Sequence, residues 1–201
     1  MQTSFNKLWV YFMLNTSQYL IMKKSKVEIL ASFLKDIHAE WVSAIPELTD
    51  AFEEIRFVKG EYLTNNWGEL YLIAEGLFGK YEKTCPVRYA INGESLMIPY
   101  HRHDYQFIAL SDCRTYMTTR KQLYTINTKN PKLFPIYASL MDKQQQYLDY
   151  RAKLLSLPNP DKYDFVFDKY PDIRQYIKHK ELAQFMGISE ELLRRLIRER
   201  E

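Results

Sequence analysis

The residues with the clearest chemistry lie near the carboxyl end of the chain, around a glycine corner. Leu182, Ala183 and Met186 form the apolar face of a short predicted helix that runs into Gly187. Ser189 follows, and its hydroxyl can cap a second helix by accepting from the free N–H groups of the first turn. Two helices joined in this way form a helix-turn-helix, whose second helix offers side chains to DNA bases in the major groove. The pattern predicts a DNA-binding segment.

Other reactive residues predict neither a metal site nor catalysis. His101 and His103 would share one face of a strand, as in half of a cupin metal site, but no third ligand follows at a suitable spacing. Cys85 and Cys113 cannot hold an iron–sulfur cluster and indicate reduced thiols in a cytoplasmic protein, although a bridge between them stays open. The chain has no Gly-x-Ser-x-Gly, phosphate-binding loop or dinucleotide fingerprint, so we expect no enzyme and no cofactor.

Composition predicts a globular protein without a membrane segment. The 201 residues are 46% hydrophobic, and the net charge of +3 is by itself too small to indicate a nucleic-acid partner. The apolar run Leu8–Leu14 is far shorter than the ~20 residues that span a bilayer, and it lacks a signal-peptide cleavage site. We therefore expect residues 1–26 to be an extension, with Met22 as a more ordinary start.

Helical and strand patterns alternate along the rest of the chain. Apolar residues recur at steps of three and four from Val27 to Trp41, which predicts a helix. Short apolar runs separated by Gly, Pro, Asn and Asp corners predict a small β-barrel or sandwich from about 52 to 120.

A long helix is predicted next, with a regular heptad. Its stripe alternates steps of four and three, as in two supercoiled helices, and predicts a homodimer. The seam positions are Leu133, Tyr137, Leu140, Gln144, Tyr147, Arg151 and Leu154. The flanking Met141, Leu148 and Leu155 would then face the β domain; in the alternative, the stripe itself packs there. Pro135 is compatible with this helix only in its first turn, and Leu157–Pro160 ends it.

This order of elements resembles the Crp/Fnr family of bacterial transcription regulators, in the variety common in Bacteroidetes. The blocks that carry the resemblance are Val58–Leu63, Tyr71–Phe78, Phe107–Asp112, Arg151–Leu157, Lys162–Tyr163 with Tyr170–Pro171, and Leu182–Ser189. It implies an α+β fold: an N-terminal β-roll of the cyclic nucleotide-binding type (a double-stranded β-helix), a long dimerisation helix and a C-terminal helix-turn-helix domain. The implied parts are the extension 1–26, the β-roll with its flanking helix 27–130, the dimerisation helix 131–156 and the DNA-binding domain 157–201.

The resemblance also implies which residues contact a palindromic double-stranded DNA site. Ser189, Glu191 and Arg195 match the family's recognition helix, in which Glu accepts from cytosine N4 and Arg donates to guanine O6 and N7. The full set is Lys180, Ser189, Glu190, Glu191, Arg194, Arg195 and Arg198. Leu192 departs from the family's Thr or Ser, and four Arg face four Glu between Ser189 and Glu201. We therefore expect weak, strongly salt-sensitive binding. Alternatively, this helix face is simply held together by its own Glu–Arg pairs.

The effector pocket implied by the resemblance departs further from the family. Its residues would be Glu94, Ser95, Arg102, Tyr105 and Gln144. The stretch 92–106 retains Gly-Glu but has a short, proline-interrupted helix, no Arg-Ser pair, and Arg102 as its sole cation. We expect an unidentified small-molecule effector rather than cyclic AMP, acting through a hinge near Leu157–Pro158. The alternatives are a degenerate sensor or interaction protein that no longer reads DNA, and a cupin-like metal-binding protein.

Overall fold

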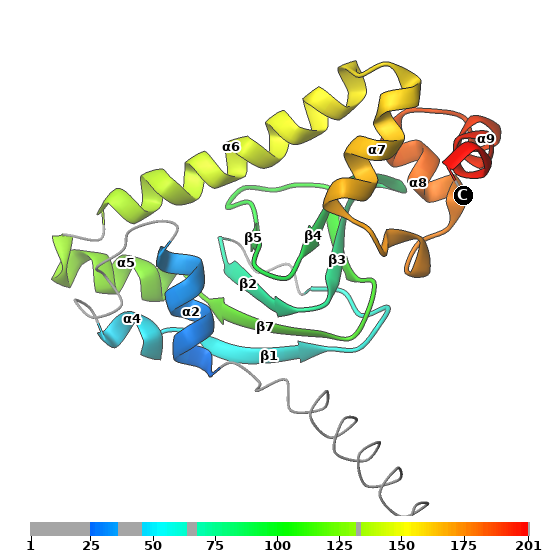
Figure 1. Ribbon diagram of the computed structural model, residues 1–201. Coiled ribbons are helices and arrows are strands. Elements are labelled where there is room, and N and C mark those ends of the chain that lie inside the picture. The colour runs from blue at the N-terminus through cyan, green and yellow to red at the C-terminus, as the bar shows by residue number, and fades with distance from the viewer. Residues whose placement is uncertain (1–24, 36–45, 64–67, 132–133, 201) are drawn as a thin grey trace, which may run out of the picture.

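The computed structural model describes residues 25–35, 46–63, 68–131 and 134–200 (Figure 1). The predicted N-terminal extension falls almost wholly outside these ranges. Within them, no helix combines the length and the apolar character that a membrane crossing requires.

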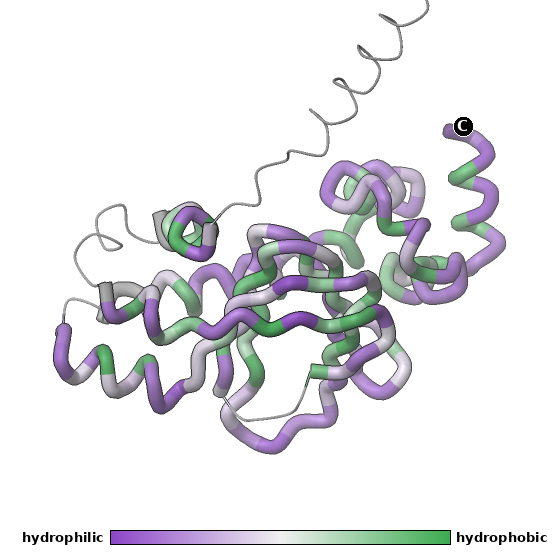
Figure 2. The backbone as a smooth tube through the Cα atoms, turned by 90° about the horizontal axis from the view of Figure 1, so that it is seen from below, coloured by the Kyte–Doolittle hydropathy of each residue, from purple (hydrophilic) through white to green (hydrophobic). Residues whose placement is uncertain are grey.

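Two antiparallel sheets, together called the β domain, form the centre of the molecule. The first sheet has the strand order β1 (Glu53–Phe57), β7 (Cys113–Thr118), β2 (Leu70–Glu75) and β5 (Ser95–Met97). The second has the order β4 (Cys85–Ile91), β3 (Leu77–Glu82) and β6 (Tyr105–Ala109). Tyr71, Ile73, Phe78 and Phe107 belong to one buried cluster with residues of both sheets, and the strands agree with the predicted β segments. Figure 2 shows these apolar strand segments in green at the centre.

Helices cover the outer face of the first sheet. They are α2 (Lys26–Lys35), α4 (Pro46–Asp50) and α5 (Arg120–Lys129). Leu30 and Leu48 pack there against Leu72 of β2. The predicted helix 27–41 is thus described as far as Lys35, and its later residues lie outside the described ranges. Helix α5 was not predicted, although the reciprocal hydrogen bonds of Thr119 and Gln122 form a capping box, for which the sequence carries the signal.

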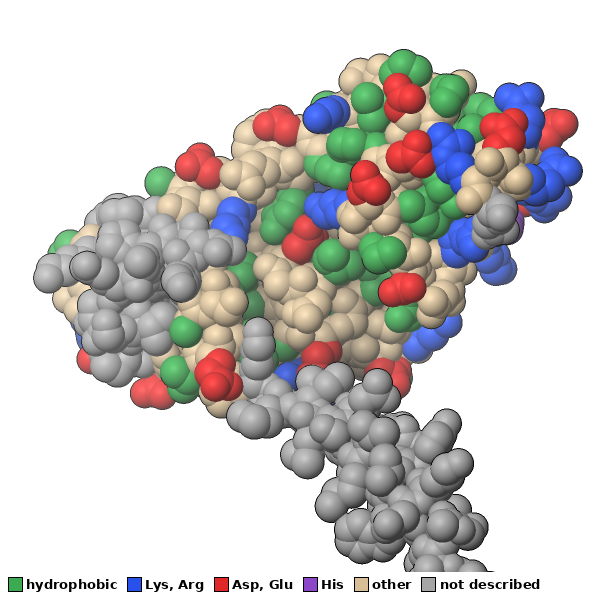
Figure 3. Space-filling view, viewed as in Figure 1, with side chains coloured by type: hydrophobic (Ala, Val, Ile, Leu, Met, Phe, Trp, Pro, Cys, Tyr) green, Lys and Arg blue, Asp and Glu red, His purple; other side chains and the backbone are tan. Residues whose placement is uncertain are grey.

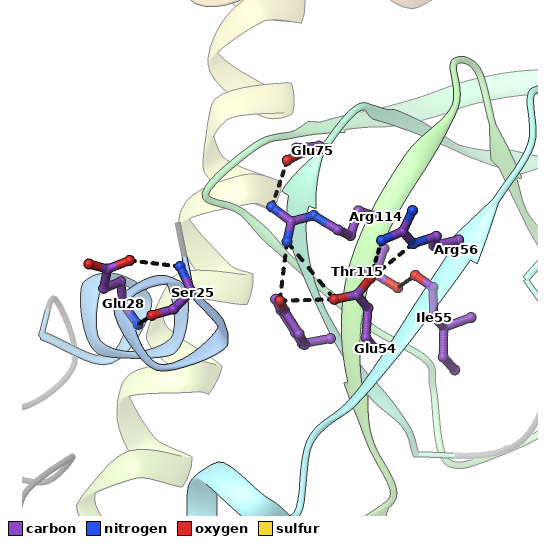
Figure 4. A network of polar contacts seen from close by, with 9 residues as sticks. Ser25, Glu28, Glu54, Ile55, Arg56, Glu75, Arg114 and Thr115 are labelled. Carbon is purple, nitrogen blue, oxygen red and sulfur yellow. Dashed lines mark hydrogen bonds and ion pairs between the residues drawn. The ribbon is translucent and has the colours of Figure 1, made fainter. Parts of the chain in front are cut away.

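A polar network fastens the strands of the first sheet (Figure 4). The guanidinium of Arg114 on β7 donates to Glu75 at 2.6 Å and to the Tyr116 hydroxyl at 3.3 Å. It also lies 3.9 Å from Glu54 on β1. Hydrogen bonding from Arg56 is the first cause that holds the pKa of Glu54 below its usual range. At the neighbouring helix, Ser25 and Glu28 cap the start of α2 reciprocally.

Helix α6 (Phe134–Ser156) runs from α5 across the β domain to the C-terminal helices (Figure 1). Pro135 lies in its first turn, as required. The assignment of its two faces was wrong. Leu140 and Leu154 of the predicted seam are 2% and 0% exposed in the chain's own cores, whereas the flanking Met141, Leu148 and Leu155 are 57%, 63% and 47% exposed. The alternative, in which the stripe packs on the β domain, holds for Leu140, Gln144 and Tyr147, while Arg151 and Leu154 also reach the C-terminal helices. Leu133 and the side chain of Tyr137 lie outside the described residues.

The chain ends in a helical unit. Its elements are α7 (Asn159–Lys169), the 3₁₀ turn η2 (Ile173–Gln175), α8 (His179–Met186) and α9 (Glu190–Arg200). Gly187 ends α8 in the left-handed region at φ 65°, which favours glycine, and α9 starts two residues after Ile188. The predicted helix pair is confirmed. Pro158 occupies the N-cap of α7, and Asp161 lies in the first turn of that helix.

The core of this unit continues onto the outer face of the second sheet. Leu77 of β3 and Tyr89 of β4 share one buried cluster with Leu154 of α6, Phe185 of α8 and Leu193 of α9. The complete architecture is α+β, as predicted: a β-roll, a long helix and a helical C-terminal unit.

Candidate functional site

Helix α9 presents one apolar and one charged face. Leu193, Leu196 and Ile197 are buried against the rest of the helical unit. The Ser189 hydroxyl accepts from Leu192 N at 3.1 Å, so it caps α9 as predicted. The opposite face exposes Glu191, Arg194, Arg195, Arg198 and Glu199 to solvent. The predicted DNA-contacting residues of α9 therefore lie together, and Lys180 is exposed on α8.

The charges on this face are paired only loosely. Arg194 lies 2.6 Å from Glu190, and Arg195 lies 3.8 Å from Glu199. The two Arg side chains are 63% and 65% exposed, so these ion pairs stabilise the helix little and can exchange for phosphate contacts. Arg200 is different, because it is held by both carboxylate oxygens of Asp164 on α7. Figure 3 shows Lys and Arg side chains gathered at this end, with Asp and Glu among them.

The predicted effector residues divide into two groups. Glu94, Ser95 and Gln144 come together beneath α6, and Gln144 donates to the Ser95 hydroxyl at 3.4 Å. Arg102 and Tyr105 do not join them: Arg102 is exposed, and Tyr105 lies under Lys80 and stacks on His103. The stretch 92–106 also contains no helix, since a turn at Gly93 leads directly into β5. The family-like placement of the pocket is therefore wrong for these two residues.

Arg88 of β4, which the sequence patterns did not single out, is central to this group. It donates to the Ser95 carbonyl at 2.7 Å and to Glu94 at 3.3 Å. Its guanidinium lies 3.3 Å from the centre of the Tyr147 ring on α6. Lys169 of α7 completes the group by pairing with Glu94 at 2.8 Å. The term polar cluster is used below for the side chains of Arg88, Glu94, Gln144, Tyr147 and Lys169.

Side chains fill the space beside Arg88 of the polar cluster. The gap between Arg88, Tyr147, Tyr150 and Lys169 is too small to hold a water molecule. Burial, and then the nearby Glu94 carboxylate, raises the pKa of Tyr147, so its phenol stays neutral. A larger cleft of about 290 Å³ lies elsewhere, between Leu77, Ile91 and the segment from Lys169 to Ile173. Of the predicted effector residues, Glu94, Ser95 and Gln144 are thus engaged by side chains of the chain itself.

The rival metal site lacks its expected geometry. His101 and His103 lie in a loop before β6, not on a strand, and His103 Nδ1 accepts from Tyr105 N at 3.2 Å. Within the described ranges, no three His, Cys, Asp or Glu side chains group in a way that could hold a metal ion. Cys85 is exposed and Cys113 buried, and both are free thiols.

A second contact that sequence patterns missed joins α8 to the second sheet. The hydroxyls of Tyr81 on β3 and Tyr89 on β4 both donate to Oε1 of Glu181, the latter at 2.9 Å. Tyr170 adds a hydrogen bond from its hydroxyl to the Tyr89 carbonyl at 2.9 Å. Burial is the first cause that raises the pKa of both Tyr81 and Tyr89 well above the usual range, so both remain donors.

Comparison with known proteins places the fold. No protein-family model matches the sequence, and no curated protein matches it. FixK2 from Bradyrhizobium japonicum superposes with a TM-score of 0.60 at 11% identity, over 74% of this chain and 83% of that one. A putative transcriptional regulator of the Crp/Fnr family from Eubacterium rectale gives 0.60 at 13% identity, over 82% and 87%. The c-di-GMP-responsive global regulator CLP from Xanthomonas campestris gives 0.55 at 14% identity, over 79% and 90%. At these identities the likeness is one of fold, and the chain has the fold of the Crp/Fnr regulators.

Proposed function

We propose that the chain is a DNA-binding transcription regulator of the Crp/Fnr type, of the variety found in Bacteroidetes. The observation that carries the proposal is the exposed face of α9, where Glu191, Arg194, Arg195 and Arg198 point away from the buried side. Glu191 and Arg195 are four residues apart on this face, and they match the chemistry of a C·G pair. A partner of this kind places its action in the cytoplasm.

The charge balance of α9 supports weak binding. Two arginines of the exposed face have acidic partners: Arg194 lies beside Glu190 and Arg195 beside Glu199. Phosphate neutralisation supplies most of the non-specific affinity of DNA-binding proteins, so a balanced face must depend on base contacts and on two-fold symmetry.

We propose that the required dimer forms through the exposed face of α6. A second heptad stripe runs along it, in alternating steps of three and four residues. The positions of this outer stripe are Ala138, Met141, Gln145, Leu148, Ala152 and Leu155, and all of them are exposed. Single exposed apolar side chains are common on protein surfaces, but Met141, Leu148 and Leu155 recur at heptad spacing beside small alanines, which fits the packing of a second helix. Pairing of two such helices would place two recognition helices on half-sites about 34 Å apart.

We further propose that this regulator does not respond to cyclic AMP. Arg88 already holds the Ser95 carbonyl and Glu94, and Glu94 is also neutralised by Lys169. A cyclic phosphate would have to displace these contacts and would meet the Glu94 carboxylate. Cyclic AMP is therefore expected to leave the melting temperature unchanged, and a rise of several degrees would contradict the proposal.

Selection from random duplex DNA at low salt tests the function directly. We expect an enriched palindrome, and Glu191→Ala and Arg195→Ala should each weaken binding to it by about tenfold to a hundredfold. Glu191→Ala should not weaken binding to random duplex, because it removes a negative charge. Arg198→Ala should lower the salt slope by about one. Arg56→Ala, at an exposed arginine of β1, is the matched control and should change nothing.

The second candidate is a degenerate sensor that no longer reads DNA. The ion pairs of α9 favour it, since they can hold the helix face without a partner. This candidate would be supported if the chain dimerises but enriches no sequence in the selection from random duplex DNA.

A further inference from the structure

The contact between α8 and the second sheet has an unusual form. Two phenol hydroxyls, from Tyr81 and Tyr89 on adjacent strands, converge on a single carboxylate oxygen of Glu181. Tyr81 is 7% exposed and Tyr89 is fully buried. Hydrogen bonds to a charged acceptor in such a setting are stronger and shorter than those between neutral groups. We call these three residues the clamp.

The strand sequence makes room for the clamp. Gly79 precedes Tyr81 on the same face of β3, and it lies opposite Tyr89 across the strand pair. A Cβ at Gly79 would collide with the Tyr81 ring, so glycine is required there for reasons of space. Tyr89 is in turn packed edge-to-face against Phe185 of α8, with ring centres 4.7 Å apart. Packing contacts that do not involve Glu181 therefore hold both tyrosine side chains in place.

Glu181 has no competing ionic partner among the described residues, since none of the ion pairs found there includes it. Two basic residues, Lys178 and Lys180, lie nearby in the sequence but are exposed. The orientation of the Glu181 carboxylate is thus set by the tyrosines of the β domain rather than by its own helix. Because Glu181 lies in the first turn of α8, the clamp fixes the end of that helix farthest from Gly187.

The clamp acts on the recognition helix through the shared core. Phe185 and Met186 of α8 lie in the same buried cluster as Leu193 and Ile197 of α9, and only the short corner 187–189 separates the two helices. A displacement of α8 on the sheet would therefore carry α9 with it.

We propose that Glu181 is a positioning residue: held by Tyr81 and Tyr89, it fixes α8, and with it the recognition helix α9, in a set orientation on the β domain without a bound effector. The expected consequence is a fixed half-site spacing in the dimer, and this part of the inference rests on the proposed DNA-binding function. It differs from control through a hinge at Leu157–Pro158, because the orientation is determined by the sheet and not by the helix break.

Three variants separate a positioning role from a general structural one. Glu181→Leu removes the acceptor, whereas Glu181→Gln retains a carbonyl oxygen that can accept from both tyrosines. Gln184→Leu makes the same kind of change at an exposed position of the same helix and is the matched control. Far-UV circular dichroism would establish that each variant is folded.

The first measurement does not depend on DNA. Spin labels at Glu53→Cys on β1 and Glu199→Cys on α9, both exposed positions, report the distance between the sheet and the recognition helix. The exposed Cys85 is replaced by Ser, and labelled chains are diluted with unlabelled ones so that single protomers are measured. One narrow distance is expected for the parent, Glu181→Gln and Gln184→Leu, and a broad distribution for Glu181→Leu. A narrow, unchanged distance in Glu181→Leu would overturn the proposal.

The second measurement varies the separation of two selected half-sites. We expect the parent and Glu181→Gln to prefer one separation, and Glu181→Leu to bind it about tenfold more weakly and lose the preference. An unchanged preference in Glu181→Leu would also overturn the proposal. A parent chain that binds no duplex would instead refute the proposed function. The positioning role of Glu181 would then be tested by the spin-label distances alone.

Discussion

The guanidinium of Arg88 lies over the ring of Tyr147 at 3.3 Å from its centre, which joins a strand of the β domain to the middle of α6. The cation is also hydrogen-bonded to Ser95 and Glu94. Lys169 meets the same carboxylate while its ammonium lies 4.5 Å from the centre of the Tyr150 ring. Segments distant in the sequence are thus tied together by two cations, one carboxylate and two aromatic rings.

Removal of Arg88 should destabilise the fold. Arg88→Met preserves much of the side-chain volume but leaves the Ser95 carbonyl without its buried donor. We expect a loss of about 2 kcal/mol in the free energy of unfolding, measured by urea denaturation. Arg56→Met is the control, because Arg56 is 65% exposed and its ion pair should contribute less than about 0.5 kcal/mol. Equal effects in the two variants would show that the polar cluster contributes no special stability.

The outer stripe of α6 predicts the effect of one charge on assembly. Leu148 is 63% exposed in the single chain, so Leu148→Glu should leave the protomer folded. At the centre of a paired helix it would bury a carboxylate, and the dimer should dissociate. Sedimentation equilibrium at micromolar concentration should show a dimer for the parent and a monomer for the variant.

Tyr124→Glu provides the control for assembly, since Tyr124 is 65% exposed on α5 and away from the stripe. It should remain a dimer. A parent chain that is monomeric at this concentration would contradict the proposed interface, and so would a dimeric Leu148→Glu.

The glycine between β2 and β3 should tolerate no side chain. Gly76 has φ +99°, and a Cβ there would lie 2.5 Å from Cys113 Sγ and 2.6 Å from the Asp112 carbonyl. We expect Gly76→Ala to cost about 3 kcal/mol or more in unfolding free energy, since strain and overlap act together. Gly60→Ala has a similar φ of +93° but nothing within 4 Å of the added carbon. Its cost should be about 1 kcal/mol, and the difference between the two isolates the steric overlap.

Lys80 predicts a pH-dependent stability. Burial, and then the charge of Arg88, lowers the pKa of Lys80 from 10.5 to about 8. Below pH 8 the amine is charged in both the folded and the unfolded chain, so the folded state bears the full cost of burying it. Between pH 8 and 10.5 the unfolded chain binds more protons, and this cost fades as pH rises.

Lys80→Met should therefore stabilise the protein at pH 7, and its advantage should shrink towards pH 10.5. Partial exposure and the contact of the ammonium with Tyr105 limit the gain to about 1 kcal/mol. Urea denaturation at pH 7, 8.5 and 10 measures it, with Lys121→Met at an exposed position as the control. A stability difference that does not vary with pH would show that Lys80 titrates normally.

Local signals in the sequence were sufficient for the helix-turn-helix corner. Gly187 and Ser189 act through their own backbone and side chain, and both do what their types predict. Pro135 likewise fixed the start of α6, because proline is excluded from the interior of a helix. The cap of α5 at Thr119 carried an equally local signal that was overlooked.

The faces of α6 could not be assigned from the sequence, because the helix carries two overlapping heptads. Leu140 and Leu154 belong to one, Met141 and Leu148 to the other, and all four are apolar. The choice depends on Ser95, Arg88 and Phe185, which contact the first stripe from remote parts of the chain.

The roles of Arg88 and Glu181 could not be predicted either, because both depend on partners from remote parts of the chain. In the sequence, Arg88 is one polar residue within a strand pattern, and Glu181 is an acidic residue of the kind common in the first turn of a helix. Tyr81 and Glu181 are 100 positions apart, so no local pattern could pair them.

Leu77 and Tyr89 belong to the same buried cluster as the terminal helices, so the second sheet and these helices stabilise each other through one core. The strands and the C-terminal helices should melt in one cooperative transition at one temperature, rather than as two units that unfold separately. A chain cut after Ser156 would leave the apolar outer side of β3 and β4 in water, and aggregation is the expected fate of such a fragment.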